Sequence, residues 1–337
     1  MLNILHDYPL LSLNTFGIQA EAKTCVFIED IPQLQEAIKQ FSGNSKLILG
    51  GGSNVVLTQN IEAILMINRI KGLQIIHEDS EFVLLECGGG EIWHDTVMYT
   101  IANGWGGLEN LSLIPGTVGA APIQNIGAYG AELKDCFVQL SAVDLESGAI
   151  RTFSQSECKF GYRESIFKHE VKGKYIITSV QFKLAKNPVI KTQYGDIQQT
   201  LLDWGITNPG VADVSKAVIH IRQSKLPNPA EIGNCGSFFK NPVIDVEHFN
   251  RLKLEFPTIK SFDVGPGKVK VPAGWLIETA GWKGFREGNY GVHEKQALVL
   301  VNYGFATGME IIQLAKRIQA DILQKFQIHL EMEVNAW

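Results

Sequence analysis

The spacing of apolar residues predicts a small α/β unit at the start of the chain. Residues 24–28 form an apolar run typical of a strand. Asp30 follows as a candidate helix cap, and the next apolar residues recur at helical spacing, at Ile31, Leu34, Ile38 and Phe41. Further strands are expected over 46–49 and 64–67. We therefore take residues 1–70 as a first α/β region.

The spacing of apolar residues also divides the rest of the chain into two further regions. In 71–212 we expect a helix over 92–102 and strands over 82–87, 138–144 and 175–184. The third region, 213–337, opens with a helix through His220 and contains a long amphipathic helix, Met309–Phe326. It ends in a segment, 328–334, whose apolar and polar residues alternate. That alternation predicts a final strand with His329, Glu331 and Glu333 on its polar face.

Composition and charge exclude several kinds of partner and cellular location. A chain of 337 residues with a net charge of -5 has no basic character, which argues against a nucleic-acid partner. Its five cysteines are odd in number and form no C-x-x-C pair, so we expect neither disulfides nor a metal site. The N-terminus does not resemble a signal peptide. We expect a cytoplasmic protein that does not insert into a membrane.

Two glycine-rich segments are candidates for binding a cofactor. The run Gly50–Asn54 directly follows an expected strand, and its backbone N–H groups could converge on phosphate oxygens. A plain tight turn is an equal alternative. The second segment lies within 110–131, which has no charged residue but several prolines and glycines, so we expect irregular buried backbone rather than a membrane helix. A packed connector is its alternative. No G-x-G-x-x-G follows a strand, and no P-loop motif occurs.

Seven short strings taken together resemble the UDP-N-acetylenolpyruvoylglucosamine reductase (MurB) family, in its type I, or long, form. They are GGGSNVV, IPGTVGAAPIQNIGAYG, FGYRESIFK, TQYGD, KLPNP, GSFFKNP and AGWLIE, in this order. The resemblance implies an α+β fold, with an FAD-binding domain of the vanillyl-alcohol-oxidase/PCMH type made of two α/β subdomains. A C-terminal α/β domain would bind the substrate. The implied reaction of peptidoglycan precursor synthesis is the NADPH-dependent reduction of UDP-N-acetylenolpyruvoylglucosamine to UDP-N-acetylmuramate.

The resemblance also implies which residues bind the cofactor and the substrate. For FAD these are Gly50, Gly51, Gly52, Ser53, Asn54, Val55, Pro115, Gly116, Gly119, Gln124, Asn125, Gly127, Ala128 and Tyr129. For the nucleotide and diphosphate of the substrate they are Tyr194, Lys225, Asn241 and Gln296. The family's lid tyrosine is replaced by Phe262, which could still stack on a base but has no hydroxyl.

Reduction of an enolpyruvyl ether requires a clamp on its carboxylate and a proton donor. Arg163 is a permanent planar cation suited to the clamp, although an ion pair with Glu164 or Glu157 would also explain it. By resemblance Ser237 donates the proton and Glu333 polarises the substrate. Met332 and Asn335 depart from the family pattern around that glutamate, so Glu331 stays open as an alternative.

With no second nucleotide motif, we expect NADPH and the UDP-sugar to share one site in turn, in a monomer. Two rival functions remain at this point. A sugar oxidase of the same flavin superfamily often holds its flavin through a His or Cys in these loops, and the glycine loops contain neither. A catalytically inactive UDP-sugar binding protein would lack one of Arg163, Ser237 and Glu333.

Overall fold

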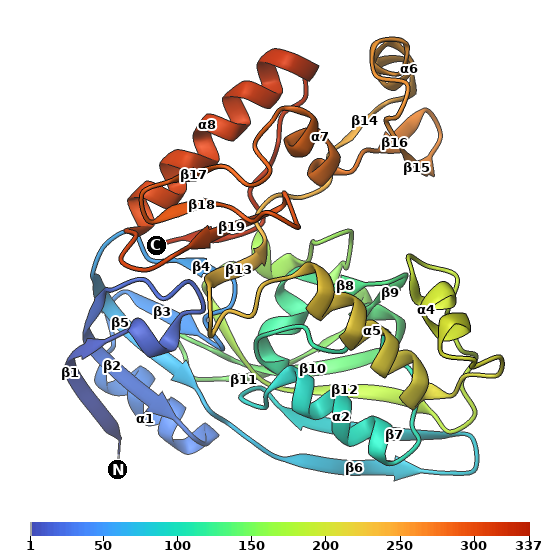
Figure 1. Ribbon diagram of the computed structural model, residues 1–337. Helices are drawn as coiled ribbons and strands as arrows, with labels where there is room; N and C mark the ends of the chain where they lie inside the picture. Colours follow the sequence, from blue (N-terminus) through green and yellow to red (C-terminus); the bar gives the residue numbers. More distant parts are fainter. Residues whose placement is uncertain (1) are drawn as a thin grey trace. The chain divides into compact units, whose positions relative to one another are not determined.

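The computed structural model describes residues 2–337, and this part of the chain divides into two compact units (Figure 1). Of the described residues, the first unit comprises 2–8, 21–52 and 61–224, and the second comprises 9–20, 53–60 and 225–337. The division near Lys225 lies beyond residue 213, where we expect the third region to begin, and the expected domain bounds stay a prediction. The division lies there because the helix at 211–225 packs its apolar face on residues of the first unit, including Ile197 and Leu201.

The first unit contains a four-stranded and a five-stranded sheet. The four-stranded sheet has the order β1-β2-β5-β3, and the pairs β2–β5 and β5–β3 are parallel. Its elements are β1 (Asn3–Pro9), β2 (Glu21–Ile28), α1 (Ile31–Gln40), β3 (Lys46–Leu49) and β5 (Ile61–Asn68). Helix α1 begins as predicted, because the Asp30 carboxylate accepts a hydrogen bond from the Gln33 N–H at 2.7 Å. Leu34 and Ile38 are buried, which confirms the predicted apolar face.

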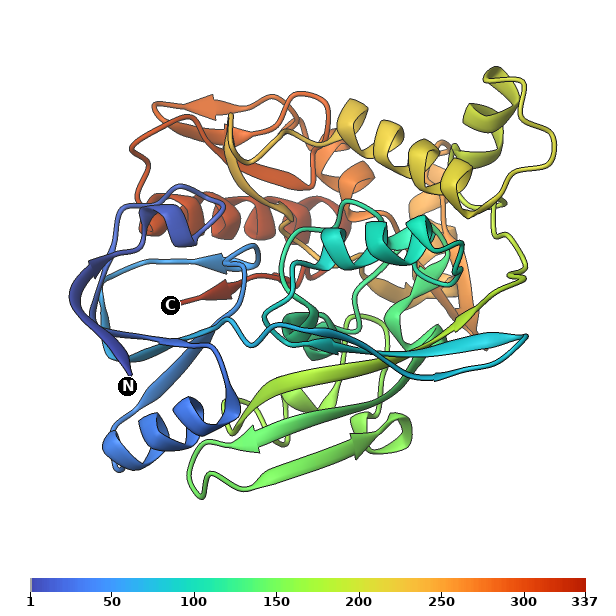
Figure 2. The same cartoon turned by 90° about the horizontal axis from the view of Figure 1, so that it is seen from below.

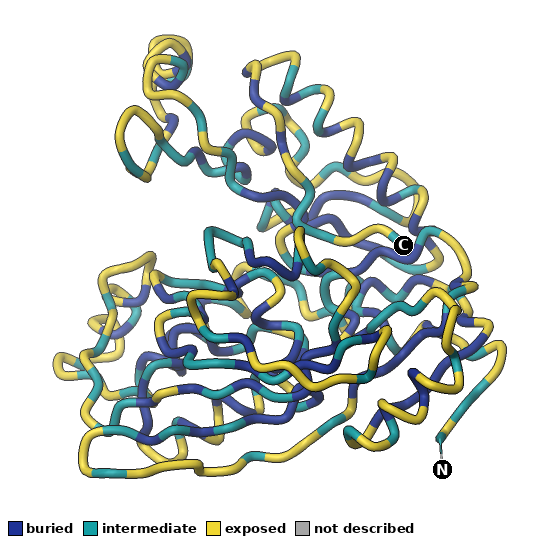
Figure 3. The backbone as a smooth tube through the Cα atoms, turned by 180° about the vertical axis from the view of Figure 1, so that it is seen from behind, coloured by how far each residue is buried: buried dark blue, intermediate teal, exposed yellow. Residues whose placement is uncertain are grey.

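The five-stranded sheet is antiparallel, with the order β11-β10-β12-β7-β6. Its strands are β6 (Leu73–Glu78), β7 (Phe82–Gly88), β10 (Phe137–Asp144), β11 (Ile150–Ser154) and β12 (Tyr175–Ala185). Figure 2 shows α2 (Trp93–Ala102) on one side of this sheet, where Trp93 meets Phe182 edge to face. Strand β6 is the edge strand, and it is mostly exposed (Figure 3).

Short elements complete the first unit. They are β8 (Gly127–Ala128), β9 (Ala131–Glu132), α3 (Gln155–Cys158), α4 (Ile197–Asp203) and α5 (Val211–Lys225). The uncharged segment 110–131 is irregular and largely buried backbone, as predicted, with a 3₁₀ turn at Val118–Gln124. Whether this unit behaves as two subdomains, divided near residue 70, stays a prediction.

The second unit is built around α8 and a small antiparallel sheet of order β13-β19-β18-β17. Its helices are α6 (Val246–Glu255), α7 (Ala273–Thr279) and α8 (Gly308–Phe326). Its strands are β4 (Val55–Val56), β13 (Gly233–Ser237), β14 (Val243–Asp245), β15 (Phe262–Gly265), β16 (Lys268–Lys270), β17 (Arg286–Glu287), β18 (Tyr290–Val292), β19 (Val299–Asn302) and β20 (Asn335–Ala336).

Helix α8 confirms the predicted amphipathic helix and lies along β18 and β19 (Figure 1). Thr307 and Glu310 form a capping box at its start, and the predicted apolar face is buried at Ile311, Leu314, Ile318, Ile322 and Phe326.

The predicted final strand over 328–334 was wrong in its extent. Only Met332 forms a β-bridge there, with Phe239, and the strand proper is β20 at Asn335–Ala336, which pairs in parallel with β4. The alternation of burial is present at Ile328–Glu331, but the segment runs beside a single short partner, so a continuous ladder cannot form.

Candidate functional site

In the first unit the two glycine loops contact each other through their backbones. A Cβ placed on Gly50 would lie 2.5 Å from Thr117 Oγ1, and one on Gly51 would lie 2.8 Å from the Gly116 Cα. Because real side chains do not approach so closely, only glycine permits this contact. Gly116 also has a φ of 114°, which disfavours any other residue. The predicted first loop is therefore more than a tight turn after β3.

Thr117 leaves a polar atom without a partner where the loops meet. Its Oγ1 is buried and makes no hydrogen bond with the described residues. Since buried polar atoms are nearly always hydrogen-bonded, an orphan of this kind indicates a missing ligand group. Close-packed glycine backbone with an unsatisfied hydroxyl fits a phosphate-bearing cofactor, which these residues would hold by hydrogen bonds.

The remaining residues predicted for FAD divide between the units. Gly52, with a φ of 61°, ends the part of the first loop that belongs to the first unit. Ser53, Asn54 and Val55 belong to the second unit, where Asn54 uses its own groups to hold the C-terminal segment. Its carbonyl accepts from the Asn335 N–H at 3.1 Å, and its Nδ2 donates to the carbonyl of Glu333 at 3.3 Å.

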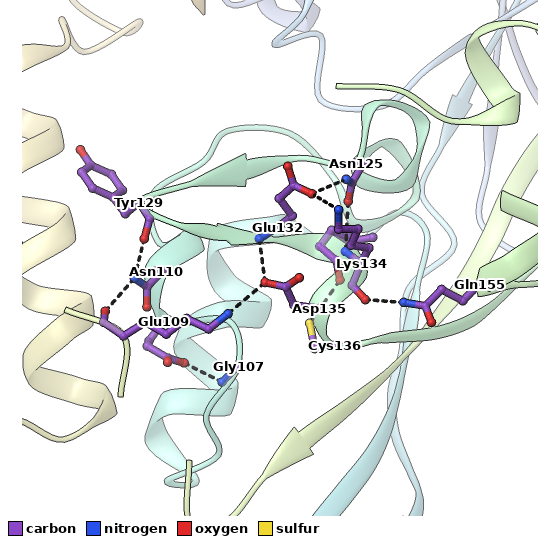
Figure 4. A network of polar contacts seen from close by, with 12 residues as sticks. Gly107, Glu109, Asn110, Asn125, Tyr129, Glu132, Lys134, Asp135, Cys136 and Gln155 are labelled. Atoms are coloured by element: carbon purple, nitrogen blue, oxygen red, sulfur yellow. Dashed lines mark hydrogen bonds and ion pairs between the residues drawn. The ribbon is translucent and has the colours of Figure 1, made fainter. Parts of the chain in front are cut away.

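Asn125 is fully buried, and its side chain fixes the second loop (Figure 4). Its Nδ2 donates to Glu132 Oε2 at 3.0 Å and to the Gly161 carbonyl at 2.9 Å, and its Oδ1 accepts from the Lys134 N–H. Its φ of 43° and the 50° of Tyr129 are left-handed, so two non-glycine residues of this loop are held in an unfavourable conformation. Any contact of Asn125 with FAD would therefore use its backbone.

Arg163 lies over this loop. Its guanidinium donates a short hydrogen bond to the carbonyl of Gly127, and a Cβ on Gly127 would come within 2.9 Å of its Nη1. Arg163 itself has a left-handed φ of 57°. Strain of this kind persists only where surrounding contacts enforce it, and it concentrates at functional sites. The predicted partners Glu164 and Glu157 have partners of their own, His169 and Arg151.

A second arginine, Arg222 on α5, lies near Arg163 and was not predicted from the sequence. Its Nε is buried without a hydrogen-bond partner among the described residues. Burial lowers the pKa of Arg222; the Tyr129 hydroxyl opposes this shift, and the positive charge of Arg163 adds to it. The only sequence signal was a cation in the last turn of a helix, which is common and unspecific.

Tyr194 belongs to the same group of side chains. A Cβ on Gly130 would lie 3.2 Å from that of Tyr194, and a Cβ on Gly195 would lie 3.6 Å from the ring of Tyr129. The two tyrosines therefore pack through these glycines. Two arginines and two tyrosines gathered in one unit form a region that can bind an anion.

In the second unit Ser237 ends β13 at an exposed position, whereas Phe238 and Phe239 behind it are buried. Ser237 pairs with Val299 of β19, and the register is irregular between Asn234 and Ser237, where Gly236 has a φ of 72°. The exposed Ser237 hydroxyl therefore lies beside buried phenylalanines, and its role as proton donor stays a prediction.

The C-terminal segment runs antiparallel to Phe238–Lys240. The Glu333 N–H donates to the Phe238 carbonyl at 2.9 Å, and the Lys240 N–H donates to the Glu331 carbonyl at 2.9 Å. The Lys240 Nζ lies 2.6 Å from Glu331 Oε1. Glu333 is close enough to Cys235 that its charge adds to burial in raising the pKa of that thiol. The two candidate glutamates thus differ: Glu331 is held in an ion pair, and Glu333 lies against β13, the strand of Ser237.

The other predicted substrate residues of this unit lie near the start of α7. The Asn241 Oδ1 accepts from the Ala273 N–H at 2.9 Å, and a Cβ on Gly274 would lie 3.3 Å from Gln296 Oε1. Lys225 is an exposed residue at the end of α5, and Phe262 is an exposed residue of β15. Among residues 2–337 no cluster of His, Cys, Asp and Glu is placed to hold a metal, and no helix is long and apolar enough to span a membrane.

Comparison with known proteins covers sequence in both units. A family model described as the FAD binding domain matches residues 22–154, and one described as the UDP-N-acetylenolpyruvoylglucosamine reductase C-terminal domain matches 228–337. The chain is 52% identical to the UDP-N-acetylenolpyruvoylglucosamine reductase of Flavobacterium johnsoniae over 335 residues, which cover 99% of both chains. It is 45% identical to that of Pseudomonas fluorescens over 338 residues, or 100% of this chain and 99% of the relative.

A solved structure supports the fold. The crystal structure of UDP-N-acetylenolpyruvylglucosamine reductase from Thermus caldophilus aligns with 100% of this chain and 99% of its own, with a TM-score of 0.68 at 22% sequence identity. The predicted α+β architecture, an FAD-binding domain followed by a C-terminal domain, is therefore confirmed. These matches establish that the chain belongs to the UDP-N-acetylenolpyruvoylglucosamine reductase family.

Proposed function

We propose that this protein reduces UDP-N-acetylenolpyruvoylglucosamine to UDP-N-acetylmuramate with NADPH, as an FAD-dependent oxidoreductase of peptidoglycan precursor synthesis. The observation that supports this most strongly is an identity of 52% over 99% of both chains with a reductase of that name. The contact between the two glycine loops adds a cradle suited to FAD. When bound, the flavin supplies the hydride that it has taken from NADPH.

The chain's own residues handle the charge that the reaction creates. A hydride added to the terminal carbon of the enolpyruvyl C=C bond leaves negative charge on the adjacent carbon and its carboxylate. Arg163 would hold that carboxylate and stabilise the charge, because its guanidinium is permanently cationic and offers two parallel N–H donors. Arg222 would add a second positive charge, and a poorly solvated arginine beside the first is suited to an anion.

Ser237 would then donate its hydroxyl proton to the carbon that carries the negative charge, which completes the lactyl ether. A serine is a weak acid, so its proton must be replaced promptly from water or a charged neighbour. Glu333 would polarise the substrate carboxylate through a hydrogen bond. We assign this role to Glu333 rather than Glu331, because Glu333 is paired with Phe238, the residue that follows Ser237.

The diphosphate and nucleotide would be bound by Tyr194, Lys225, Asn241 and Gln296. The sequence has no separate glycine fingerprint for a second dinucleotide, so NADPH and the UDP-sugar would occupy the same site in turn. Plots of inverse initial rate against inverse substrate concentration should then be parallel, with each substrate inhibiting in excess. Intersecting lines would contradict the shared site.

The test of the function as a whole uses the purified protein. It should be yellow, acid should release intact FAD, and NADPH should bleach the bound flavin. Addition of the enolpyruvyl UDP-sugar without oxygen should restore the colour with formation of UDP-N-acetylmuramate, identified by mass spectrometry. A colourless protein that takes up no FAD, or a reduced protein that the sugar does not re-oxidise, would contradict the proposal.

A further inference from the structure

We infer that Lys240 is a positioning residue, which locks the register of the C-terminal segment and so determines which glutamate reaches the substrate. This inference rests on the proposed function. Lys240 follows Ser237 by three residues, and its ammonium is bound to Glu331, two residues before Glu333. Nothing in the roles assigned above uses this lysine.

The geometry of the pairing assigns faces to the side chains. Phe239 and Met332 form the bridge, and the hydrogen bonds on both sides of it identify them as a non-hydrogen-bonded antiparallel pair. Directly opposed residues project to the same face, and facing alternates along each strand. Lys240 is therefore opposed to Glu331, and Phe238 to Glu333, with both glutamates on one face.

Because both glutamates share that face, a slip of two residues would exchange them without turning any side chain over. In the slipped register Glu331 would stand opposite Phe238, where Glu333 stands now, and Lys240 would face His329. A slip in the other direction would place Lys240 opposite Glu333 instead of Glu331. Only the observed register gives Lys240 a carboxylate and leaves Glu333 in its place beside β13.

Other contacts also hold this segment. Gln319 Nε2 donates to the Leu330 carbonyl at 2.7 Å, and Asn54 Nδ2 donates to that of Glu333. Beyond Glu333, the Asn335 Nδ2 donates to the Asn54 carbonyl at 3.2 Å, and β20 pairs with β4. The Lys240–Glu331 pair differs from the two amide contacts because it joins two side chains, so it depends on which residue of the segment stands opposite Lys240.

Burial makes the loss of this ion pair more costly than the loss of an ordinary surface pair. The Lys240 side chain is only 8% exposed, whereas Glu331 is 69% exposed. A buried ammonium requires a carboxylate, since its desolvation is otherwise uncompensated. An apolar side chain of similar volume would often serve stability as well, so a buried lysine at this place is better explained by the register that it selects.

The experiment compares the two half-reactions in Lys240→Met, Lys240→Arg, Glu331→Gln and Glu331→Lys by stopped flow, with Lys325→Met as control. Lys325 forms an exposed ion pair with Asp321 on α8 in the same unit. We expect Lys240→Met to keep its FAD and to be reduced by NADPH within about twofold of wild type. Its re-oxidation by the enolpyruvyl sugar should fall roughly ten- to hundredfold, and Lys240→Arg should recover most of that loss.

The Glu331 variants separate register control from general stabilisation. Glu331→Gln takes its carboxylate away from the buried ammonium, so it should also slow re-oxidation roughly ten- to hundredfold, and it should add little to Lys240→Met, because both changes remove the same contact. In Glu331→Lys the new ammonium faces that of Lys240, so the two like charges repel each other. Because Glu331 is 69% exposed, the protein should tolerate the substitution, and re-oxidation should slow about as much as in Lys240→Met. This variant keeps the test decisive if Lys240→Met does not fold.

Three results would overturn the inference. One is a wild-type re-oxidation rate in Lys240→Met or in Glu331→Lys. Another is equal slowing of both half-reactions together with a lowered Tm, which would mean a merely structural lysine. The third is no recovery in Lys240→Arg. Failure of the proposed function is distinguishable, because the wild-type protein would then fail to be re-oxidised by the sugar.

Discussion

The glycine loops of the first unit and the serine region of the second are built in opposite ways. The glycine backbone of the first loop packs closely on the second loop, so a Cβ added to Gly50 would collide with the Thr117 side chain and one added to Gly51 with the Gly116 backbone. The serine region is held by side chains, among them Lys240 and Glu331. A phosphate-bearing cofactor can be bound by amide N–H groups that every residue carries, whereas proton transfer and charge stabilisation require particular functional groups.

This difference separates binding of the cofactor from chemistry on the substrate. Changes in the loops should remove the flavin, and changes around Ser237 should leave the flavin bound but unable to deliver its electrons to the sugar. Four predictions test this separation, in decreasing order of expected effect.

Ser237→Ala should have the largest effect, and only on the second half-reaction. A positioned proton donor contributes roughly 10²–10⁴-fold, so re-oxidation by the sugar should slow by that factor, while FAD content and reduction by NADPH stay nearly unchanged. Ser237→Cys retains a donor and should recover part of the rate. Stopped-flow traces of each half-reaction measure both variants. A loss below about tenfold, or equal slowing of flavin reduction, would mean that Ser237 is not the proton donor.

Arg163→Lys tests the predicted carboxylate clamp, whose guanidinium donates a hydrogen bond to the carbonyl of Gly127 in the second glycine loop. Lysine keeps the charge but loses the planar pair of donors, and hydrogen bonds to charged groups contribute about 1.5–3 kcal/mol, so kcat/KM for the sugar should fall roughly 10- to 100-fold. Arg151→Lys is the control, since Arg151 is an exposed partner of Glu157 in the same unit. If the two variants behave alike, the carboxylate clamp must be sought elsewhere.

Gly51→Ala should weaken FAD binding itself. Overpacking typically destabilises by about 1–3 kcal/mol, which corresponds to roughly a tenfold or greater rise in the Kd for FAD. Gly210→Ala is the matched control, because neither glycine has a left-handed φ and the nearest atom to a Cβ on Gly210 is 3.8 Å away. Flavin fluorescence titration of the apoproteins measures both. Normal FAD affinity in Gly51→Ala would contradict the backbone contact as the basis of the cradle.

The smallest expected effect is on the pH dependence of stability, through a hydrogen bond between His94 and the backbone of Leu113. His94 Nδ1 accepts a hydrogen bond from the Leu113 N–H at 3.0 Å, and burial lowers the His94 pKa below its usual 6.5. The unfolded chain therefore binds this proton at a higher pH than the folded protein. The stabilising effect of neutral His94 is complete above about pH 6.5 and declines as the pH falls below it.

His94→Gln should flatten that decline, because glutamine does not titrate. Thermal unfolding at pH 7.5 and 5.5 measures the difference in Tm between the two pH values for each protein. His293, whose pKa is also lowered by burial, should retain part of the slope in the variant. An unchanged slope in His94→Gln would show that this hydrogen bond does not control the pH dependence.

Local sequence patterns were sufficient to predict the longer helices and several of the longer strands. Helices α1 and α8 follow from caps and apolar faces, which are local properties of the chain. The glycine loops and the types of Arg163, Ser237 and Glu333 could be read from motifs. Local signals also suggested a strand over 328–334, but a strand needs a partner of equal length, and the pattern contains no information about the partner.

Only the tertiary structure decided how distant residues meet. It brought Arg222 to Arg163, showed that Gly51 must pass Gly116, and gave Glu331 a buried lysine as its partner. These facts depend on contacts between segments far apart in the chain, which periodicity and spacing cannot encode. Glu331 and Glu333 are an example, because they lie two residues apart in the chain and are opposed to different residues, Lys240 and Phe238.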